Sequence, residues 1–165
     1  MSWFPWQTAM NQGFYINGKS VSSVPLKHMP GTGYAILQAT LLYIAASGRK
    51  VRAMCGMPTD GLSIPRFFWR VAGPPFRHVY LLAALIHDHL CKKAASLPVG
   101  AERDALRLAA DMLFREMCLF IKPKAKVRAS VLYAAVRLGA WWAKNEPIAP
   151  DYEHEPDRYT RLLQG

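Results

Sequence analysis

Leu81-Leu82-Ala83-Ala84-Leu85-Ile86-His87-Asp88-His89 is the stretch of sequence that decides the fold. Its first six residues are apolar enough to form a buried helix, and three polar residues follow them directly. A buried carboxylate or imidazole without a partner costs several kcal/mol, which is comparable to the whole stability of a small domain. We therefore expect these polar groups to satisfy one another, to bind an ion or to do chemistry.

A second polar insertion lies upstream, at Thr59-Asp60-Gly61-Leu62-Ser63-Ile64-Pro65. Asp60 follows a predicted strand end in a turn that contains glycine, so its carboxylate can point toward the helical half of the chain. We expect Asp60 to meet His87 and Asp88 inside the folded molecule.

The length and composition bound the architecture. With 165 residues and 52% hydrophobic residues, the chain is long and apolar enough to fold as one domain, which excludes a disordered protein. We assign residues 1–145 to this domain, with an N-terminal arm and a short strand in residues 1–30. Residues 146–165 are predicted to form a proline-rich C-terminal tail.

Turn-forming residues divide the first half of the chain into short segments. Phe14-Tyr15-Ile16 is predicted to form a short strand. Tyr34 to Ala46 and Val51 to Cys55 are predicted to form a hairpin with its tip at Ser47-Gly48. The alanines of the first arm leave a helix open as the alternative there.

The second half is predicted to be helical. A short helix is expected from Pro65, and longer ones over Phe76–Lys93, Gly100–Ile121 and Lys124–Lys144. The sequence thus predicts an α+β fold, in which a small N-terminal hairpin or sheet layer packs on a three-helix layer between extended terminal arms. The last helix carries apolar residues spaced to lie near one face, namely Val127, Val131, Leu138 and Trp142.

Charge, cysteines and apolar runs limit the classes of partner. The formal net charge of +10 favours polyanions, but nucleic acid is suggested by charge alone, because no run of basic residues and no recognised motif accompanies it. The three cysteines are isolated and are expected to be reduced thiols in a cytoplasmic product. No signal peptide or transmembrane segment is predicted. Trp3 and Trp6, in the N-terminal arm, are candidates for contacting a protein partner.

Asp111 is a further acidic candidate, because its neighbours in sequence are apolar. The alternative is a surface ion-pair network on a helix, since Arg107 and Arg115 lie four residues to either side.

Three interpretations stay open for Asp60, His87 and Asp88. In the first, they form a structural polar clamp, in which Asp60 caps a helix or binds the turn. In the second, they ligate a divalent metal such as zinc or manganese, which activates water with help from Asp111 or His89. In the third, Asp88 orients His87 as the general base of a metal-free hydrolase. Ser63 lacks the glycine-flanked turn of a serine nucleophile and is expected to be a cap.

The chain resembles an uncharacterised family of small bacteriophage and prophage proteins, marked by T-D-G-x-S-I-P, H-D and A-D-x-x-F motifs. These motifs correspond to Thr59–Pro65, His87-Asp88 and Ala110–Phe114, and the resemblance covers roughly Tyr34 to Trp142. It implies a phage origin, and that Asp60, His87, Asp88 and Asp111 belong to one constellation. It implies no particular activity.

The leading hypothesis is a small, basic, phage-encoded protein with a metal-dependent hydrolase-like site at the junction of sheet and helices. Asp60, His87 and Asp88 are its candidate catalytic residues, and Asp111 joins them as a candidate ligand of zinc or manganese. The alternative is a virion or tail-associated protein in which the same cluster is structural. Its arms would then bind virion subunits or a host protein, after synthesis in the host cytoplasm.

Overall fold

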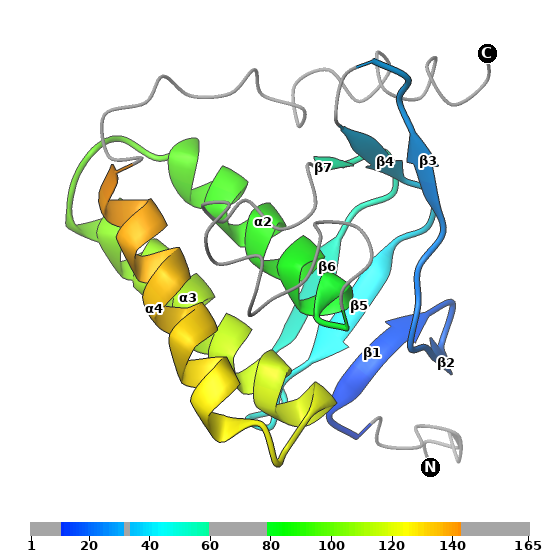
Figure 1. The fold of residues 1–165 in the computed structure, drawn as a ribbon. Helices are drawn as coiled ribbons and strands as arrows, with labels where there is room; N and C mark the ends of the chain where they lie inside the picture. Colours follow the sequence, from blue (N-terminus) through cyan, green and yellow to red (C-terminus); the bar gives the residue numbers. More distant parts are fainter. Residues whose placement is uncertain (1–10, 32–33, 60–78, 143–165) are drawn as a thin grey trace, which may run out of the picture.

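The computed structural model describes residues 11–31, 34–59 and 79–142, with side chains up to residue 139 (Figure 1). Two small antiparallel sheets lie on one side of the molecule, and the helices α2, α3 and α4 lie on the other. This arrangement confirms the predicted α+β class. Among the described residues, no helix is long and apolar enough to cross a membrane.

The larger sheet has the strand order β2-β1-β5-β6 and is antiparallel throughout. Its first two strands are joined by Asn17-Gly18, and both residues have positive φ, as the tight hairpin turn requires. The predicted strand at residues 14–16 and the hairpin tip at residues 47–48 are confirmed. The strands are β1 (Gly13–Ile16), β2 (Lys19–Ser20), β5 (Leu41–Ile44) and β6 (Lys50–Ala53).

The smaller sheet has the order β3-β4-β7, with strands Leu26–His28, Ala35–Leu37 and Pro58–Thr59. The predicted first arm of the hairpin, residues 34–46, is therefore divided between the two sheets as β4 and β5, and the helical alternative for it is wrong. Strand β7 ends at Thr59, directly before Asp60, as the turn prediction required.

The three helices are α2 (Leu81–Ala95), α3 (Ala101–Ile121) and α4 (Lys126–Trp142). Helix α2 contacts both β6 and α3, and α4 packs on α3, so that α2 lies between the sheets and the other helices (Figure 1). Because α2 has neighbours on two sides, most of its residues are buried, as its apolar sequence predicted.

The face of α4 that packs on the core is not the one predicted from its large apolar residues. Val127 is 80% exposed and Leu138 is 54% exposed. The buried stripe consists of two alanines and two larger apolar residues, namely Ala129, Leu132, Ala135 and Val136. Alanines allow two helices to approach closely, and this outweighed the placement of the larger side chains.

A polar clamp joins α3 to the larger sheet. Glu116 accepts hydrogen bonds from the Tyr43 hydroxyl at 2.9 Å, the Ala46 backbone N–H at 3.0 Å and the Gln12 amide at 3.2 Å. Burial, together with the Glu116 carboxylate, raises the pKa of Tyr43 well above its usual range. Tyr43 therefore stays neutral and keeps its proton to donate.

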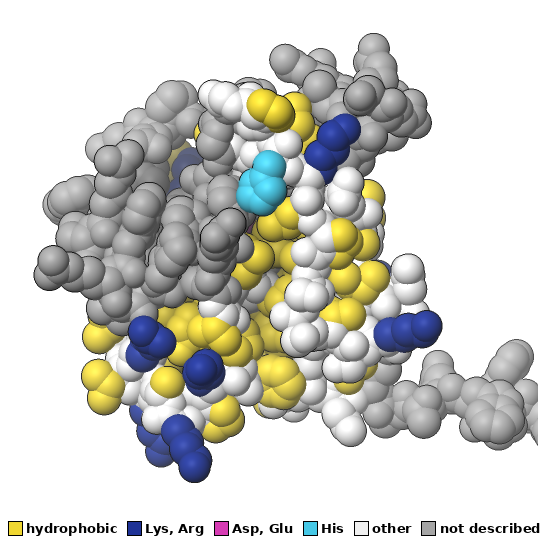
Figure 2. All heavy atoms as spheres, turned by 45° about the vertical axis from the view of Figure 1, so that its right-hand side comes forward, with side chains coloured by type: hydrophobic (Ala, Val, Ile, Leu, Met, Phe, Trp, Pro, Cys, Tyr) yellow, Lys and Arg dark blue, Asp and Glu magenta, His cyan; other side chains and the backbone are white. Residues whose placement is uncertain are grey.

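The positive charge is dispersed on the face drawn in Figure 2, where Lys and Arg side chains occur at several separate places among apolar ones. Among the described residues of this face, the Lys and Arg side chains do not join into one continuous basic surface.

Candidate functional site

The centre of the candidate site is His87, on the side of α2 that faces α3. Neighbours along this helix, such as Leu85 and Ile86, are completely buried. The His87 side chain remains 14% exposed, and its ring packs on Phe114 of α3 with the ring centroids 5.1 Å apart. His87 is therefore held by the core and still reaches the surface.

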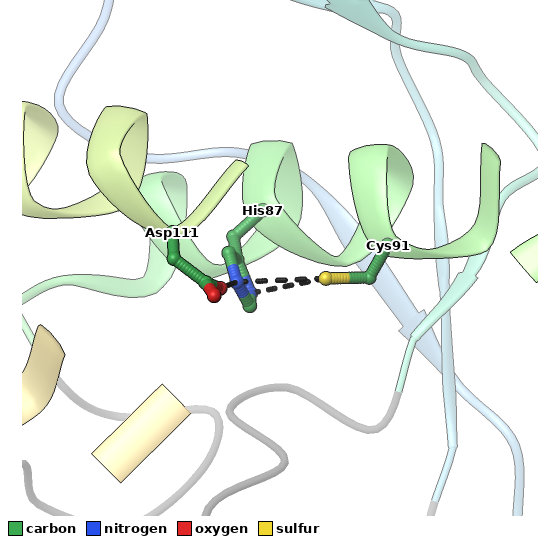
Figure 3. A group of neighbouring side chains, drawn as sticks. All are labelled: His87, Cys91 and Asp111. Carbon is green, nitrogen blue, oxygen red and sulfur yellow. Dashed lines mark hydrogen bonds and ion pairs between the residues drawn. The ribbon is translucent and has the colours of Figure 1, made fainter. Parts of the chain in front are cut away.

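His87 and Asp111, two of the four residues that the resemblance groups together, meet. Nε2 of His87 lies 2.7 Å from Oδ1 of Asp111, whose side chain is 1% exposed (Figure 3). The contact joins α2 to α3 across 24 positions of sequence. Because Asp111 is buried, it does not belong to a surface ion-pair network, and that alternative is wrong.

Arg137 of α4 completes the environment of this carboxylate. Its guanidinium donates a hydrogen bond of 2.9 Å to Oδ2 of Asp111, and the arginine side chain is 41% exposed. Each oxygen of the buried carboxylate thus has a partner, one from each neighbouring helix. A buried carboxylate held in this way costs much less than an unpaired one.

Cys91 lies one helical turn after His87. Its Sγ is 3.5 Å from Nε2 and 3.9 Å from Nδ1 of His87 (Figure 3). The ligand atoms of His87, Cys91 and Asp111 all lie within 4.8 Å of one another. In the part of the chain that the structure describes, these three residues are the ones placed closely enough together to hold a metal ion.

The charges around His87 favour its protonated form. Burial alone lowers the pKa of the imidazole, but a negative charge on the Cys91 sulfur and the hydrogen-bonded Asp111 carboxylate raise it to about 10. With Arg137 on its other oxygen, the Asp111 carboxylate lies between the imidazolium and the guanidinium, and each positive charge stabilises it.

Asp88 points to different partners. Its Oδ2 accepts a hydrogen bond of 2.9 Å from the Lys92 ammonium, which also donates to the backbone carbonyl of Pro58 in β7. The interpretation in which Asp88 orients His87 is therefore wrong, because Asp111 occupies that place. Asp88 and Lys92 instead connect α2 to the strand that precedes Asp60.

Two of the predicted positions, Asp60 and Ser63, lie outside the described residues, and so does the short helix predicted from Pro65. His89 is buried but does not belong to the group of three ligands. The cluster lies between the helices α2, α3 and α4, not at the predicted junction of sheet and helices. The reason is that His87 is on the side of α2 turned away from the strands.

Sequence reasoning missed two members of the cluster. Cys91 was expected only to be an isolated, reduced thiol, although its spacing of four from His87 places both on one helix face. Arg137 was not among the candidate site residues, and no local signal shows that it reaches a carboxylate on α3.

Comparison with known proteins places the chain in a family. Residues 34–136 match the family model described as "Protein of unknown function (DUF1353)". The chain belongs to this family. The matched range begins at Tyr34, where the resemblance was predicted to begin, and ends at Val136, shortly before the predicted Trp142. It includes every described member of the cluster except Arg137.

One curated relative is itself uncharacterised. The chain is 44% identical over 46 residues to "Uncharacterized protein y4jT" of Sinorhizobium fredii, which is 28% of this chain and 14% of that protein. The chain thus corresponds to a small part of the relative's length. No solved structure matches the chain.

Proposed function

We propose that this DUF1353 protein is a hydrolase in which His87 activates a water molecule and Asp111 orients the imidazole. The observation that carries the proposal is the 2.7 Å contact between a fully buried carboxylate and a partly exposed imidazole. A histidine held by a carboxylate at one ring nitrogen is the arrangement that general-base catalysis requires of its base and orienting group.

The atom that acts on water is Nδ1. Asp111 binds Nε2 and so holds the proton of the neutral ring on that nitrogen, which leaves the lone pair on Nδ1. As Nδ1 takes a proton from water, the ring becomes positively charged. The Asp111 carboxylate stabilises that charge without taking the proton itself.

Arg137 is a positioning residue in this proposal. By binding Oδ2 of Asp111, it fixes the plane of the carboxylate and so the orientation of the ring. Its positive charge also partly neutralises the Asp111 carboxylate, which limits how far that carboxylate raises the pKa of His87. Arg137 does not touch the reacting water.

The raised pKa of His87, about 10, sets the expected pH dependence. At neutral pH most imidazole rings are protonated and only a small fraction can accept a proton. Hydrolysis should therefore become faster as the pH rises toward about 10, where half of the rings are in the basic form.

The substrate class that suits the chain is an anionic ester. The net charge of +10 attracts negatively charged molecules over a distance, and the partly exposed Arg137 guanidinium lies beside the carboxylate that binds the imidazole. A carboxylic or phosphoric ester with a nearby negative charge would benefit from both. The reaction would be attack of the activated water on the ester, with expulsion of the alcohol.

The experiment is an ester-hydrolysis screen with purified full-length chain. Chromogenic carboxylic esters and phosphodiesters are offered to the wild type and to His87→Gln, Asp111→Asn and Asp104→Asn, the last being a matched change at an exposed position of α3. Loss of the base should lower kcat/KM by about 10²–10⁴-fold, while Asp104→Asn should leave it unchanged. Turnover that survives His87→Gln would refute the proposal.

The metal-dependent form of the hydrolase also belongs to this proposal. Its predicted ligands included Asp60 and Asp88, of which Asp60 lies outside the described residues and Asp88 binds Lys92. An ion at these two acids would require Lys92 to leave Asp88. Addition of zinc or manganese to the screen tests whether such an ion accelerates the reaction.

A phage origin is the other part of the proposal and follows from the resemblance. The virion-associated alternative depends on the Trp-containing N-terminal arm and the proline-rich tail, and residues 1–10 and 143–165 lie outside the described residues. It stays a prediction, and co-purification of the chain with intact phage particles tests it.

A further inference from the structure

We propose that His87, Cys91 and Asp111 form a binding site for Zn²⁺. The inference goes beyond the proposed function, because metal binding at these residues requires no catalysis. It also replaces the ligand set predicted from the sequence, since Cys91 enters and Asp88 does not.

The spacing of His87 and Cys91 already suits zinc. Two residues four positions apart on a helix present their side chains on one face, as in other helical zinc sites. With Zn–S and Zn–N bonds of about 2.3 and 2.0–2.1 Å, tetrahedral geometry requires roughly 3.6 Å between sulfur and nitrogen. The Sγ–Nε2 distance is 3.5 Å, but Sγ is also 3.9 Å from Nδ1, so the sulfur lies over the face of the ring. The imidazole must therefore turn before Nε2 and Sγ can share an ion.

Asp111 supplies the third ligand once the imidazole has turned toward Sγ. Oδ1 and Nε2 are 2.7 Å apart, the distance of a hydrogen bond, whereas two tetrahedral zinc ligands lie roughly 3.4 Å apart. The ion would take the place of the proton between these atoms, and the two side chains would separate slightly. Arg137 would keep Oδ2 and orient the carboxylate from outside the coordination sphere.

The donor set selects the ion. A thiolate, an imidazole and a carboxylate suit Zn²⁺, whereas Mg²⁺, Ca²⁺ and Mn²⁺ prefer oxygen ligands. Three protein ligands leave the fourth tetrahedral position to water. The site can be reached from solvent, because His87 is 14% exposed and Cys91 is only partly buried.

Zinc binding and base catalysis are alternative states of one imidazole. The ion occupies Nε2 and breaks the hydrogen bond to Asp111, so the metal-bound protein is not the form that takes a proton from water. Metal binding is therefore measured without substrate, and its result does not depend on whether the proposed hydrolase is active.

Cobalt is the spectroscopic probe. Chelator-treated full-length chain is titrated with Co²⁺, which should bind at one equivalent with visible bands of tetrahedral geometry and a near-ultraviolet thiolate band. Zn²⁺ should displace it. Cys91→Ser should remove the thiolate band and weaken binding at least about tenfold. The matched control Cys55→Ser, at an exposed free cysteine, should change neither.

A second measurement uses the wild type alone, in case a variant fails to fold. Alkylation of the cysteines by iodoacetamide is followed by mass spectrometry with and without Zn²⁺. Zinc should slow the modification of Cys91 at least about tenfold and leave that of Cys55 unchanged. Equal rates at Cys91 with and without saturating Zn²⁺, or tetrahedral Co²⁺ binding that survives Cys91→Ser, would overturn the proposal.

Discussion

Nε2 of His87 and Oδ1 of Asp111 lie 2.7 Å apart, although the residues are 24 positions apart in sequence and belong to different helices. Arg137 of a third helix holds the other oxygen of the same carboxylate. One buried acid therefore ties α2, α3 and α4 together. The stability of the helical layer and the chemistry of the imidazole depend on the same carboxylate.

Removal of the Asp111 carboxylate should strongly destabilise the fold. Asp111→Ala leaves the His87 imidazolium and the Arg137 guanidinium without their shared partner. The free energy of unfolding should fall by about 3–5 kcal/mol, the usual cost of removing one member of a buried ion pair. Urea unfolding followed by circular dichroism measures it. Asp104→Ala, at an exposed position of the same helix, should cost much less. Equal losses in the two variants would show that Asp111 is not a structural centre.

Removal of the Arg137 side-chain charge should have a smaller effect. Arg137→Gln loses one charge-assisted hydrogen bond, but the side chain is 41% exposed and water replaces part of the interaction. We expect a loss of about 1 kcal/mol in the free energy of unfolding. Arg115→Gln, at an exposed arginine of α3, is the control and should change the stability little.

The stability difference between wild type and His87→Gln should depend on pH. The pKa of His87 is about 10 in the folded chain and near 6.5 when unfolded, so the folded state binds the proton more tightly. This stabilisation is complete below about pH 6.5 and is lost as the pH rises to about 10. Unfolding free energies of both proteins across this range measure it. A constant difference would contradict a raised pKa.

The clamp between α3 and the larger sheet gives an independent test of packing. Glu116→Ala leaves the buried Tyr43 hydroxyl without its main acceptor and should lower the free energy of unfolding by about 1–3 kcal/mol. In a double-mutant cycle with Tyr43→Phe, the two losses should not add, because they remove the same hydrogen bond. Strict additivity would show that the contact contributes nothing in solution.

Local pattern was sufficient to predict most elements of the fold. The apolar run before His87 predicted a buried helix, and Ser47-Gly48 marked a hairpin turn that the structure contains. Local pattern did not predict the features that depend on packing between distant elements. The segment 34–46 contains β-branched and aromatic residues as well as alanines, and only tertiary contacts determine that it divides between two sheets. On α4, small alanines face the core and Val127 does not, since close helix approach depends on the neighbouring helix.

The candidate site could be predicted only in part. The placement of His87 and Asp111 in apolar sequence indicated that they needed partners, and they satisfy one another. The role of Asp88 was missed, although its spacing of four from Lys92 is that of a helical ion pair and residues 87 and 88 point in different directions on a helix. Arg137 approaches Asp111 from another helix, and no sequence period records such a contact.

The most direct test of the account is a histidine titration of metal-free protein by nuclear magnetic resonance. One imidazole resonance, absent from His87→Gln, should titrate near pH 10 in the wild type, and its pKa should fall in Asp111→Asn. That result would place the imidazole against the buried carboxylate in solution. A His87 resonance that titrates near its ordinary value of about 6.5, with no change in Asp111→Asn, would contradict the account.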